Sequence, residues 1–268
     1  MGPGTSYYSL SLWSPVPGPV PLVQLVKASP RLLRISRAMA AFRDAPPKEA
    51  FTRREWPIIR RCRSPEQVQR FLRSLPYNWE RGGDTLRSFR EVVRRGTAQC
   101  LEAALVAAVI LEQHGYPPLV VSFESKDGID HVIYVFRRRG PAPHGAGRGP
   151  WGSVARSRDA GLHGRRPVFR TIRELVWSYF DPYVDFTGRI TGYQLVDLRK
   201  LGRYDWRFSR QNMWKVEKFL LDIPHRRLRS SDRRYKTLHE RYKEYRKRDP
   251  TGPVIDIYSH RDTWMALD

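Results

Sequence analysis

The sequence contains only two cysteines, Cys62 and Cys100, among its 268 residues. Two thiols cannot build a disulfide framework, and without clustered histidines they do not make a structural zinc site. We therefore expect no metal and no cofactor, and a reducing, cytoplasmic environment. Cys62 is flanked by arginines and is expected to be a surface residue without a chemical role.

Long hydrophobic runs are also lacking. The longest apolar stretch, 103–111, is too short for a membrane-spanning helix. The N-terminal segment is apolar, but it is interrupted by Pro15, Pro17, Pro19 and Pro21 and has no basic region before it. Neither a membrane span nor a signal peptide is expected.

Acidic residues are few compared with basic ones: 27 Asp and Glu stand against 49 Lys and Arg, for a formal net charge of +22. Such an excess favours weak association with polyanions such as nucleic acid. A general preference for arginine, with the charge spread over solvated faces, is an alternative explanation of this composition. The alternative is favoured because no aromatic-rich RNA-binding motif accompanies the basic residues. The content of apolar residues, 40%, is enough for a folded core.

The distribution of proline, glycine and charge divides the chain into three expected parts. Residues 1–62 form a Pro-rich leader with an accessory helix, residues 63–205 form the compact core, and residues 206–268 form a basic helical extension. The helices expected outside the core lie at 30–42, 211–223 and 226–248.

Within the core, apolar periodicity predicts helices and strands. Ser64 and Gln67 have the spacing of a capping box at one helix start, and Asp84 is expected to cap the next helix. After Gly96, a helix that is apolar nearly all round is expected in the middle of the domain. The other expected elements are strands at 119–125, 131–138 and 151–157, a helix at 170–180, a loop at 137–150, and a strand followed by a short turn or helix within 190–201. These elements predict an α+β fold, in which a central helix packs on an antiparallel sheet and further helices lie at both ends of the chain.

The strongest chemical signal is a cysteine at a helix start followed by a histidine on a strand. Cys100 comes directly after Gly96-Thr97-Ala98-Gln99, where free amides and the helix dipole lower the pKa of a thiol. His131 opens an apolar strand and is the candidate base. The backbone N–H of Cys100 and the side chain of Gln99 are candidate oxyanion donors. The order predicts a cysteine nucleophile, although either residue alone is more often explained by packing.

The stretch from about Glu66 to Asp197 resembles the transglutaminase-like superfamily and, within it, a widespread set of bacterial conserved proteins. The segments that carry this resemblance are LPYNWE, TLRSFREV, AQCLEAAL, HGYPP, DHVIYVF, WGSVARSRDAGLHGRRPVF and SYFDPYVD. The resemblance implies a papain-like core with cysteine, histidine and aspartate on a helix start and two neighbouring strands. Members of the superfamily include protein crosslinkers, proteases and peptide-N-glycanases, so the fold alone does not choose a substrate.

The third member of the triad is where this sequence departs from the superfamily pattern. The pattern usually has Trp, two or three apolar residues and then Asp-Pro, whereas here Trp151 leads to Ser157 and Asp159. Asp159 is the predicted residue that orients His131, and Ser157 is the alternative. Asp130 is expected on the opposite face of a regular strand.

The loop 161–167 is expected to line the cleft behind the third strand. Its His163 and Arg165, together with Trp151, are candidate contacts for an acidic or carboxylate-bearing substrate. A plain turn without a binding role is an equally good interpretation of this loop.

Two functions from different classes remain open. In the first, Cys100 attacks a peptide or amide carbonyl, His131 moves the proton, and water or an amine resolves the thioester, with hydrolysis favoured over transfer. In the second, a catalytically degenerate papain-like fold holds an acidic partner or nucleic acid on its basic surface. The intact order of cysteine and histidine favours the first, and the missing aspartate favours the second.

Overall fold

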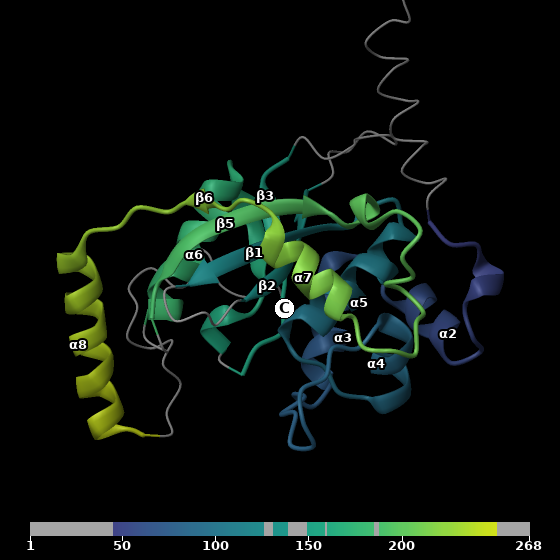
Figure 1. Cartoon of the computed structure of the whole chain (residues 1–268), viewed down its shortest axis with the longest axis horizontal. Coiled ribbons are helices and arrows are strands. Elements are labelled where there is room, and N and C mark those ends of the chain that lie inside the picture. Colours follow the sequence, from purple (N-terminus) through teal and green to yellow (C-terminus); the bar gives the residue numbers. More distant parts are fainter. Residues whose placement is uncertain (1–44, 126–130, 139–148, 159, 185–187, 251–268) are drawn as a thin grey trace, which may run out of the picture.

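The computed structural model describes residues 45–125, 131–138, 149–158, 160–184 and 188–250 (Figure 1). The leader, the helix expected at 30–42 and most of the loop expected at 137–150 lie outside these residues. The described part holds seven α-helices and a six-stranded antiparallel sheet, so the fold is mixed α+β as predicted. The α-helices are α2 (Glu55–Arg61), α3 (Pro65–Ser74), α4 (Phe89–Arg95), α5 (Cys100–Glu112), α6 (Ile172–Val184), α7 (Trp214–Asp222) and α8 (Asp232–Arg248).

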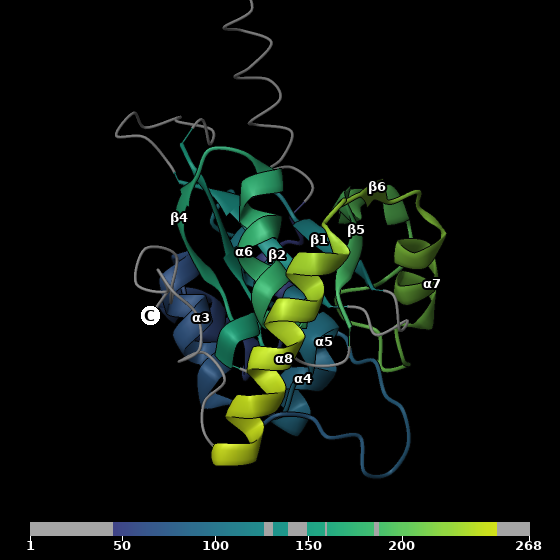
Figure 2. The ribbon, with the colours of Figure 1, turned by 90° about the vertical axis from the view of Figure 1, so that its left-hand side faces the viewer.

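The strands of the sheet lie in the order β4-β3-β2-β1-β5-β6, and every neighbouring pair is antiparallel. The strands are β1 (Leu119–Ser125), β2 (Val132–Arg137), β3 (Trp151–Val154), β4 (Arg165–Phe169), β5 (Ile190–Asp197) and β6 (Arg226–Arg227). The first four strands follow one another as a meander, after which the chain returns to place β5 beside β1. Helix α6 makes this return and therefore lies across one face of the sheet (Figure 2).

The alternation of side chains along the strands builds a separate core on each face. On β2, Val132 and Tyr134 belong to the cluster around α5, whereas Ile133 and Val135 belong to the cluster around α6. The register of β1 against β2 keeps this division, because Val120 pairs with Tyr134 on the α5 face. A shift of one residue would exchange the two faces.

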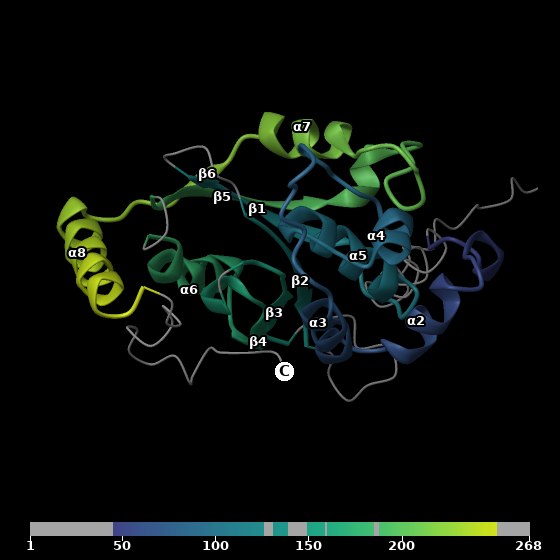
Figure 3. The same ribbon diagram turned by 90° about the horizontal axis from the view of Figure 1, so that it is seen from below.

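Helix α5 is the centre of the larger core. Every residue from Leu101 to Glu112 is buried, because α2, α3, α4 and the sheet surround the helix (Figure 3). A helix that is apolar on all sides requires such a position. The same cluster includes residues from beyond the expected core boundaries at 62/63 and 205/206, namely Phe51, Ile59, Cys62, Trp206, Met213, Val216 and Leu220. Neither boundary therefore separates one hydrophobic core from another, and the expectation that Cys62 is a surface residue is wrong, since its side chain is buried in this core.

The sequence predicts the N-terminal caps of two helices, and the structure confirms only one of them. The capping box is confirmed, since Ser64 Oγ accepts from the Gln67 N–H and Gln67 Oε1 accepts from the Ser64 N–H. The prediction that Asp84 caps the next helix is wrong, because α4 begins at Phe89 with Ser88 as its cap. Leu86 and Arg87 use their backbone in longer-range bonds instead: Leu86 bonds to the segment that leads into α7, and Arg87 bonds to Glu102.

The C-terminal half also differs from the expected pattern. Residues 165–169, of which 165–167 were expected in a loop, form the edge strand β4. The basic helix α8 begins at Asp232, because Arg226–Arg227 pair with β5. Helix α6 continues through Pro182 to Val184. Helix α8 contacts α6 and lies at the end of the molecule opposite α2 (Figures 1 and 3).

Over the described ranges, no helix combines the length and the apolar character needed to span a membrane. The longest helix, α8, is rich in charged residues.

Candidate functional site

Cys100 is the first residue of α5, as the sequence predicts. Gly96 ends α4 with a left-handed φ of 73°, which favours glycine and lets the chain turn toward the next helix. Gln99 then caps α5, because its Oε1 accepts from the backbone N–H of Leu101 at 2.7 Å. The Gln99 side chain thus has a capping role, and its predicted role as an oxyanion donor stays a prediction.

A hollow of about 190 Å³ surrounds the half-buried Cys100, and we call it the cysteine hollow. Its lining residues are Tyr77, Glu80, Gln99, Cys100, Leu101, Ser122, Val132, Glu217, Leu220 and Leu221. They come from the segment before α4, the start of α5, strands β1 and β2, and helix α7. The contribution of α7 was not expected from the sequence, because α7 lies more than one hundred residues after Cys100.

The surroundings of Cys100 favour a protonated thiol. Burial raises the pKa of the Cys100 thiol to about 11, and hydrogen bonds from the backbone of Val132 and Leu101 offset only part of this rise. The carboxylate of Glu102 adds to the increase. The lowered pKa expected at a helix start is therefore not what the structure indicates, because desolvation outweighs the helix terminus.

The side chain of His131 lies on the other face of the sheet from Cys100. Its ring packs against Phe123 and Tyr179, which belong to the core between the sheet and α6. The next residue, Val132, faces α5 and lines the cysteine hollow. The predicted catalytic pair of cysteine and histidine is thus not brought together, and the reason is the alternation of side chains along the strand.

His131 is held as a neutral residue of this second core. Its Nε2 donates to the carbonyl oxygen of Leu162 at 3.0 Å, and its ring is stacked on Phe123 with centroids 5.9 Å apart. Burial lowers the pKa of His131 to about 4. These contacts indicate a structural role in packing.

A buried polar cluster surrounds His131 on the α6 face. Arg165 is only 1% exposed, and its guanidinium donates to the carbonyl oxygens of Gly161, His163 and Ser178 while lying 4.0 Å from the ring centroid of Tyr179. The expectation that Arg165 contacts substrate from a cleft loop is therefore wrong. This arginine ties β4 and the preceding turn to α6.

The remaining candidate residues lie apart from Cys100. His163 donates from Nε2 to the carbonyl oxygen of the buried Ser157 at 3.2 Å, and burial lowers the pKa of His163 to about 4. Trp151 is half-buried on β3, with Arg137 over its ring. Asp159 and Asp130 lie outside the described residues, so their predicted positions stay predictions.

The sequence did not point to the buried carboxylate beside Cys100. Glu102 is fully buried and accepts from the backbone N–H groups of Gln99 and Arg87 and from the side-chain amide of Asn78. Burial raises the pKa of Glu102. The spacing Gln99-x-x-Glu102 is that of a capping box and is the signal that would have indicated this contact.

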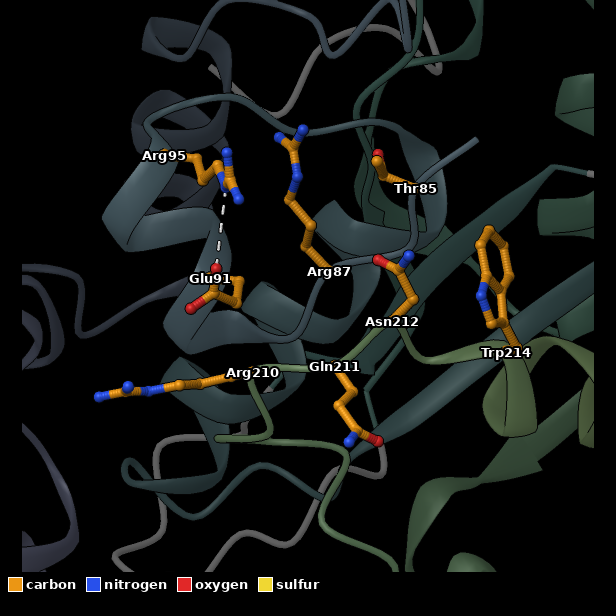
Figure 4. Close-up of a pocket in the computed structure, with 8 residues that line it drawn as sticks. All are labelled: Thr85, Arg87, Glu91, Arg95, Arg210, Gln211, Asn212 and Trp214. Carbon is orange, nitrogen blue, oxygen red and sulfur yellow. Dashed lines mark ion pairs between the residues drawn. The ribbon is translucent and has the colours of Figure 1, made fainter. Parts of the chain in front are cut away.

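A second and larger hollow, of about 540 Å³, lies between α4 and the start of α7 (Figure 4). We call it the arginine hollow, and its lining residues are Thr85, Arg87, Glu91, Arg95, Arg210, Gln211, Asn212 and Trp214. No sequence motif indicated it, because its residues come from two segments more than one hundred positions apart. Among the residues that the structure describes, no three His, Cys, Asp or Glu side chains are grouped to hold a metal ion.

Comparison with known proteins does not assign a family to this arrangement. No family model matches the sequence, and no curated protein matches it either.

Proposed function

We propose that this protein is a binding module in which a transglutaminase-like frame has lost Cys-His catalysis and holds a polyanion, foremost a nucleic acid, on its basic surface. The observation that carries the proposal is the placement of Cys100 and His131 on opposite faces of the sheet. A base must reach the proton that it removes, and a side chain behind a sheet does not reach a thiol in front of it.

The charge of the chain supports a polyanionic partner. The formal net charge is +22, and helix α8 carries Arg and Lys along an exposed surface at one end of the molecule. Phosphate backbones bind such surfaces through Coulomb attraction and release of counterions. The arginine hollow adds a concave site whose guanidinium groups can bind an anionic group.

The frame supports the resemblance to the transglutaminase-like superfamily in its coarse features. A buried helix that begins with a cysteine packs on an antiparallel meander, and the strand after the helix precedes the strand at His131. This likeness concerns architecture only, and function is argued from the site.

Thiol alkylation at neutral pH tests the loss of catalysis. In a Cys62→Ala variant, Cys100 is the only thiol, and we expect iodoacetamide to label it at least about tenfold more slowly than free cysteine, whose pKa is about 8.5. His131→Gln is the matched variant, since glutamine can also donate to Leu162, and the labelling rate should not change. Labelling that is faster than that of free cysteine and is lost in His131→Gln would overturn the proposal.

Fluorescence anisotropy with a labelled single-stranded oligonucleotide tests the binding function. Affinity should fall steeply between about 50 and 200 mM salt, because several phosphates are contacted. An acidic peptide of equal charge serves as the competing partner. Tighter binding of the peptide, or no binding of the oligonucleotide at low salt, would contradict the choice of nucleic acid.

One observation favours a second candidate, the cysteine hydrolase or acyl transferase. Cys100 lines a hollow at the start of a helix, where a carbonyl can approach the sulfur and backbone N–H groups lie nearby. Release of amine from amide or peptide substrates, with loss of turnover in Cys100→Ser, would establish this function in place of binding.

A further inference from the structure

Three arginine side chains line the arginine hollow. Figure 4 shows the guanidinium groups of Arg87 and Arg95 on the same side of the hollow, while the Arg210 side chain extends away from them at the lower edge. Arg87 is held in place by Thr97, to which its Nη1 donates at 2.7 Å. A fixed guanidinium loses little conformational freedom when it binds an anion.

The one carboxylate in the lining, Glu91, offsets only part of the positive charge of these arginines. Glu91 is bound by Arg94, with Nε lying 3.0 Å and 2.9 Å from its two oxygens, and Arg94 does not line the hollow. Arg95 also forms an ion pair with Glu91, with 3.8 Å between its Nε and a Glu91 oxygen, and Arg87 Nε lies 3.8 Å from the buried Glu102. Arg210 is exposed, and its positive charge is among the causes that lower the pKa of Glu91. The hollow therefore keeps an excess of positive charge.

Neutral donors complete the surface. Asn212 Oδ1 accepts from the backbone N–H of Leu86 at 3.1 Å, which orients the amide and leaves its Nδ2–H donors for another partner. Gln211 adds an exposed side-chain amide at the same edge. A site of this kind offers donors from several directions, which suits a ligand with several acceptor oxygens.

An exposed tryptophan marks the other end of the hollow. Trp214 opens α7 and leaves 43% of its surface in solvent. In Figure 4 its ring lies beyond Asn212, on the side of the hollow away from Arg95. Unpaired bases stack on exposed aromatic rings of this kind, while their phosphates bind neighbouring arginine side chains.

We propose that the arginine hollow binds a nucleoside phosphate, with the phosphate at Arg87 and Arg95, the base against Trp214, and Arg210 adding positive charge at the edge of the site. The proposal rests on the proposed binding of nucleic acid and names the chemical unit that this protein would hold. A phosphate monoester offers nearly two charges and three acceptor oxygens, which match several guanidinium forks better than a single carboxylate does. A volume of about 540 Å³ is within the range of small-molecule sites.

Isothermal titration calorimetry on the full chain tests the site with three probes: adenosine monophosphate, inorganic phosphate and adenosine. We expect the nucleotide to bind at least about tenfold more tightly than phosphate, because stacking of one base contributes about 1–3 kcal/mol. Adenosine alone should bind most weakly. Equal affinity for the nucleotide and phosphate, or no nucleotide binding at low salt, would overturn the proposal.

Two variants locate the binding. Arg95→Gln with Arg210→Gln should weaken nucleotide and phosphate alike by at least about tenfold, since both lose charge-assisted bonds. Trp214→Ala should weaken the nucleotide by about tenfold and leave phosphate within about twofold. The matched control removes the same charge elsewhere, with Arg170→Gln and Arg173→Gln at the start of α6, and should leave both affinities within about twofold.

The results of these experiments distinguish failure of the nucleotide site from failure of the proposed nucleic-acid binding. If the control pair lowers nucleotide affinity as much as the Arg95 and Arg210 pair does, only net charge matters and the site is refuted. If the nucleotide binds in the hollow but the labelled oligonucleotide does not bind, the site stands with a free nucleotide as its ligand and the nucleic-acid function fails. If the oligonucleotide binds and loses affinity only in the hollow variants, the bound unit is a nucleotide within a single strand.

Discussion

Cys100 and His131 lie on opposite faces of the central sheet, although the backbone of the next residue, Val132, hydrogen-bonds toward the sulfur. Side chains alternate between the two faces of a sheet along a strand, so a histidine one residue later would face the thiol, whereas His131 is buried behind the sheet. Burial keeps the thiol protonated, and the lining of the cysteine hollow contains no histidine that would offset this effect.

Moving the imidazole by one residue should create the missing pair. In Val132→His, the ring replaces a side chain that lines the cysteine hollow and is 5% exposed. A protonated imidazole beside the sulfur stabilises the thiolate, so alkylation of Cys100 at pH 7 should become at least about tenfold faster. Val132→Asn has a similar size without a basic nitrogen and should leave the rate unchanged; equal rates in the two variants would show that the side chain does not reach the sulfur.

The stability of the protein should fall as the pH is lowered from neutrality. His131 and His163 have pKa values lowered by burial from 6.5 to about 4, so the unfolded chain takes up their protons first. The free energy of unfolding therefore decreases through this range, by up to about 3 kcal/mol for the buried His131. Urea unfolding at a series of pH values measures this slope.

His131→Gln supplies the comparison for that slope. The variant is expected to be less stable at neutral pH, but its stability should depend less on pH because one titrating group is gone. An unchanged slope would mean that His131 does not carry the effect.

Arg165→Lys should destabilise the fold strongly. The buried guanidinium donates to three backbone carbonyl groups and to Ser178 Oγ, and an ammonium group cannot reproduce this fork. The free energy of unfolding should fall by about 2–4 kcal/mol. Arg170→Lys, at an exposed position, should change it by less than about 0.5 kcal/mol; a similarly small effect in Arg165→Lys would contradict the role given to this arginine.

Gly152→Ala should also lower stability, because β3 and β4 approach closely there. A Cβ at Gly152 would lie 2.9 Å from the carbonyl oxygen of Arg165 and 2.9 Å from the nitrogen of Pro167, both backbone atoms. Overpacking of this kind costs about 1–3 kcal/mol. Gly82→Ala is the control, since nothing lies within 4 Å of its added Cβ; thermal unfolding should distinguish the two variants, and equal midpoints would refute the close contact.

Local patterns predicted much of the fold. The capping box at Ser64 and Gln67, the buried helix that starts at Cys100 and the strands at 119–125 and 131–138 follow from spacing and residue type within a short window. Long-range contacts decided the rest. Leu86 and Arg87 stayed out of a helix because their backbone bonds to Asn212, Met213 and Glu102. Arg226–Arg227 became a strand because they pair with the edge of β5.

In the candidate site, too, some features follow from the local sequence and others depend on long-range contacts. By itself, the sequence determined that a cysteine begins a buried helix and that a histidine stands at the head of the following apolar strand, because both depend on neighbouring residues. Only the tertiary structure decided that the histidine faces α6, that α7 covers the cysteine, and that three arginines and Trp214 line one hollow. The physical reason is that strand register and helix docking set the face of each side chain, and both depend on residues far away in the chain.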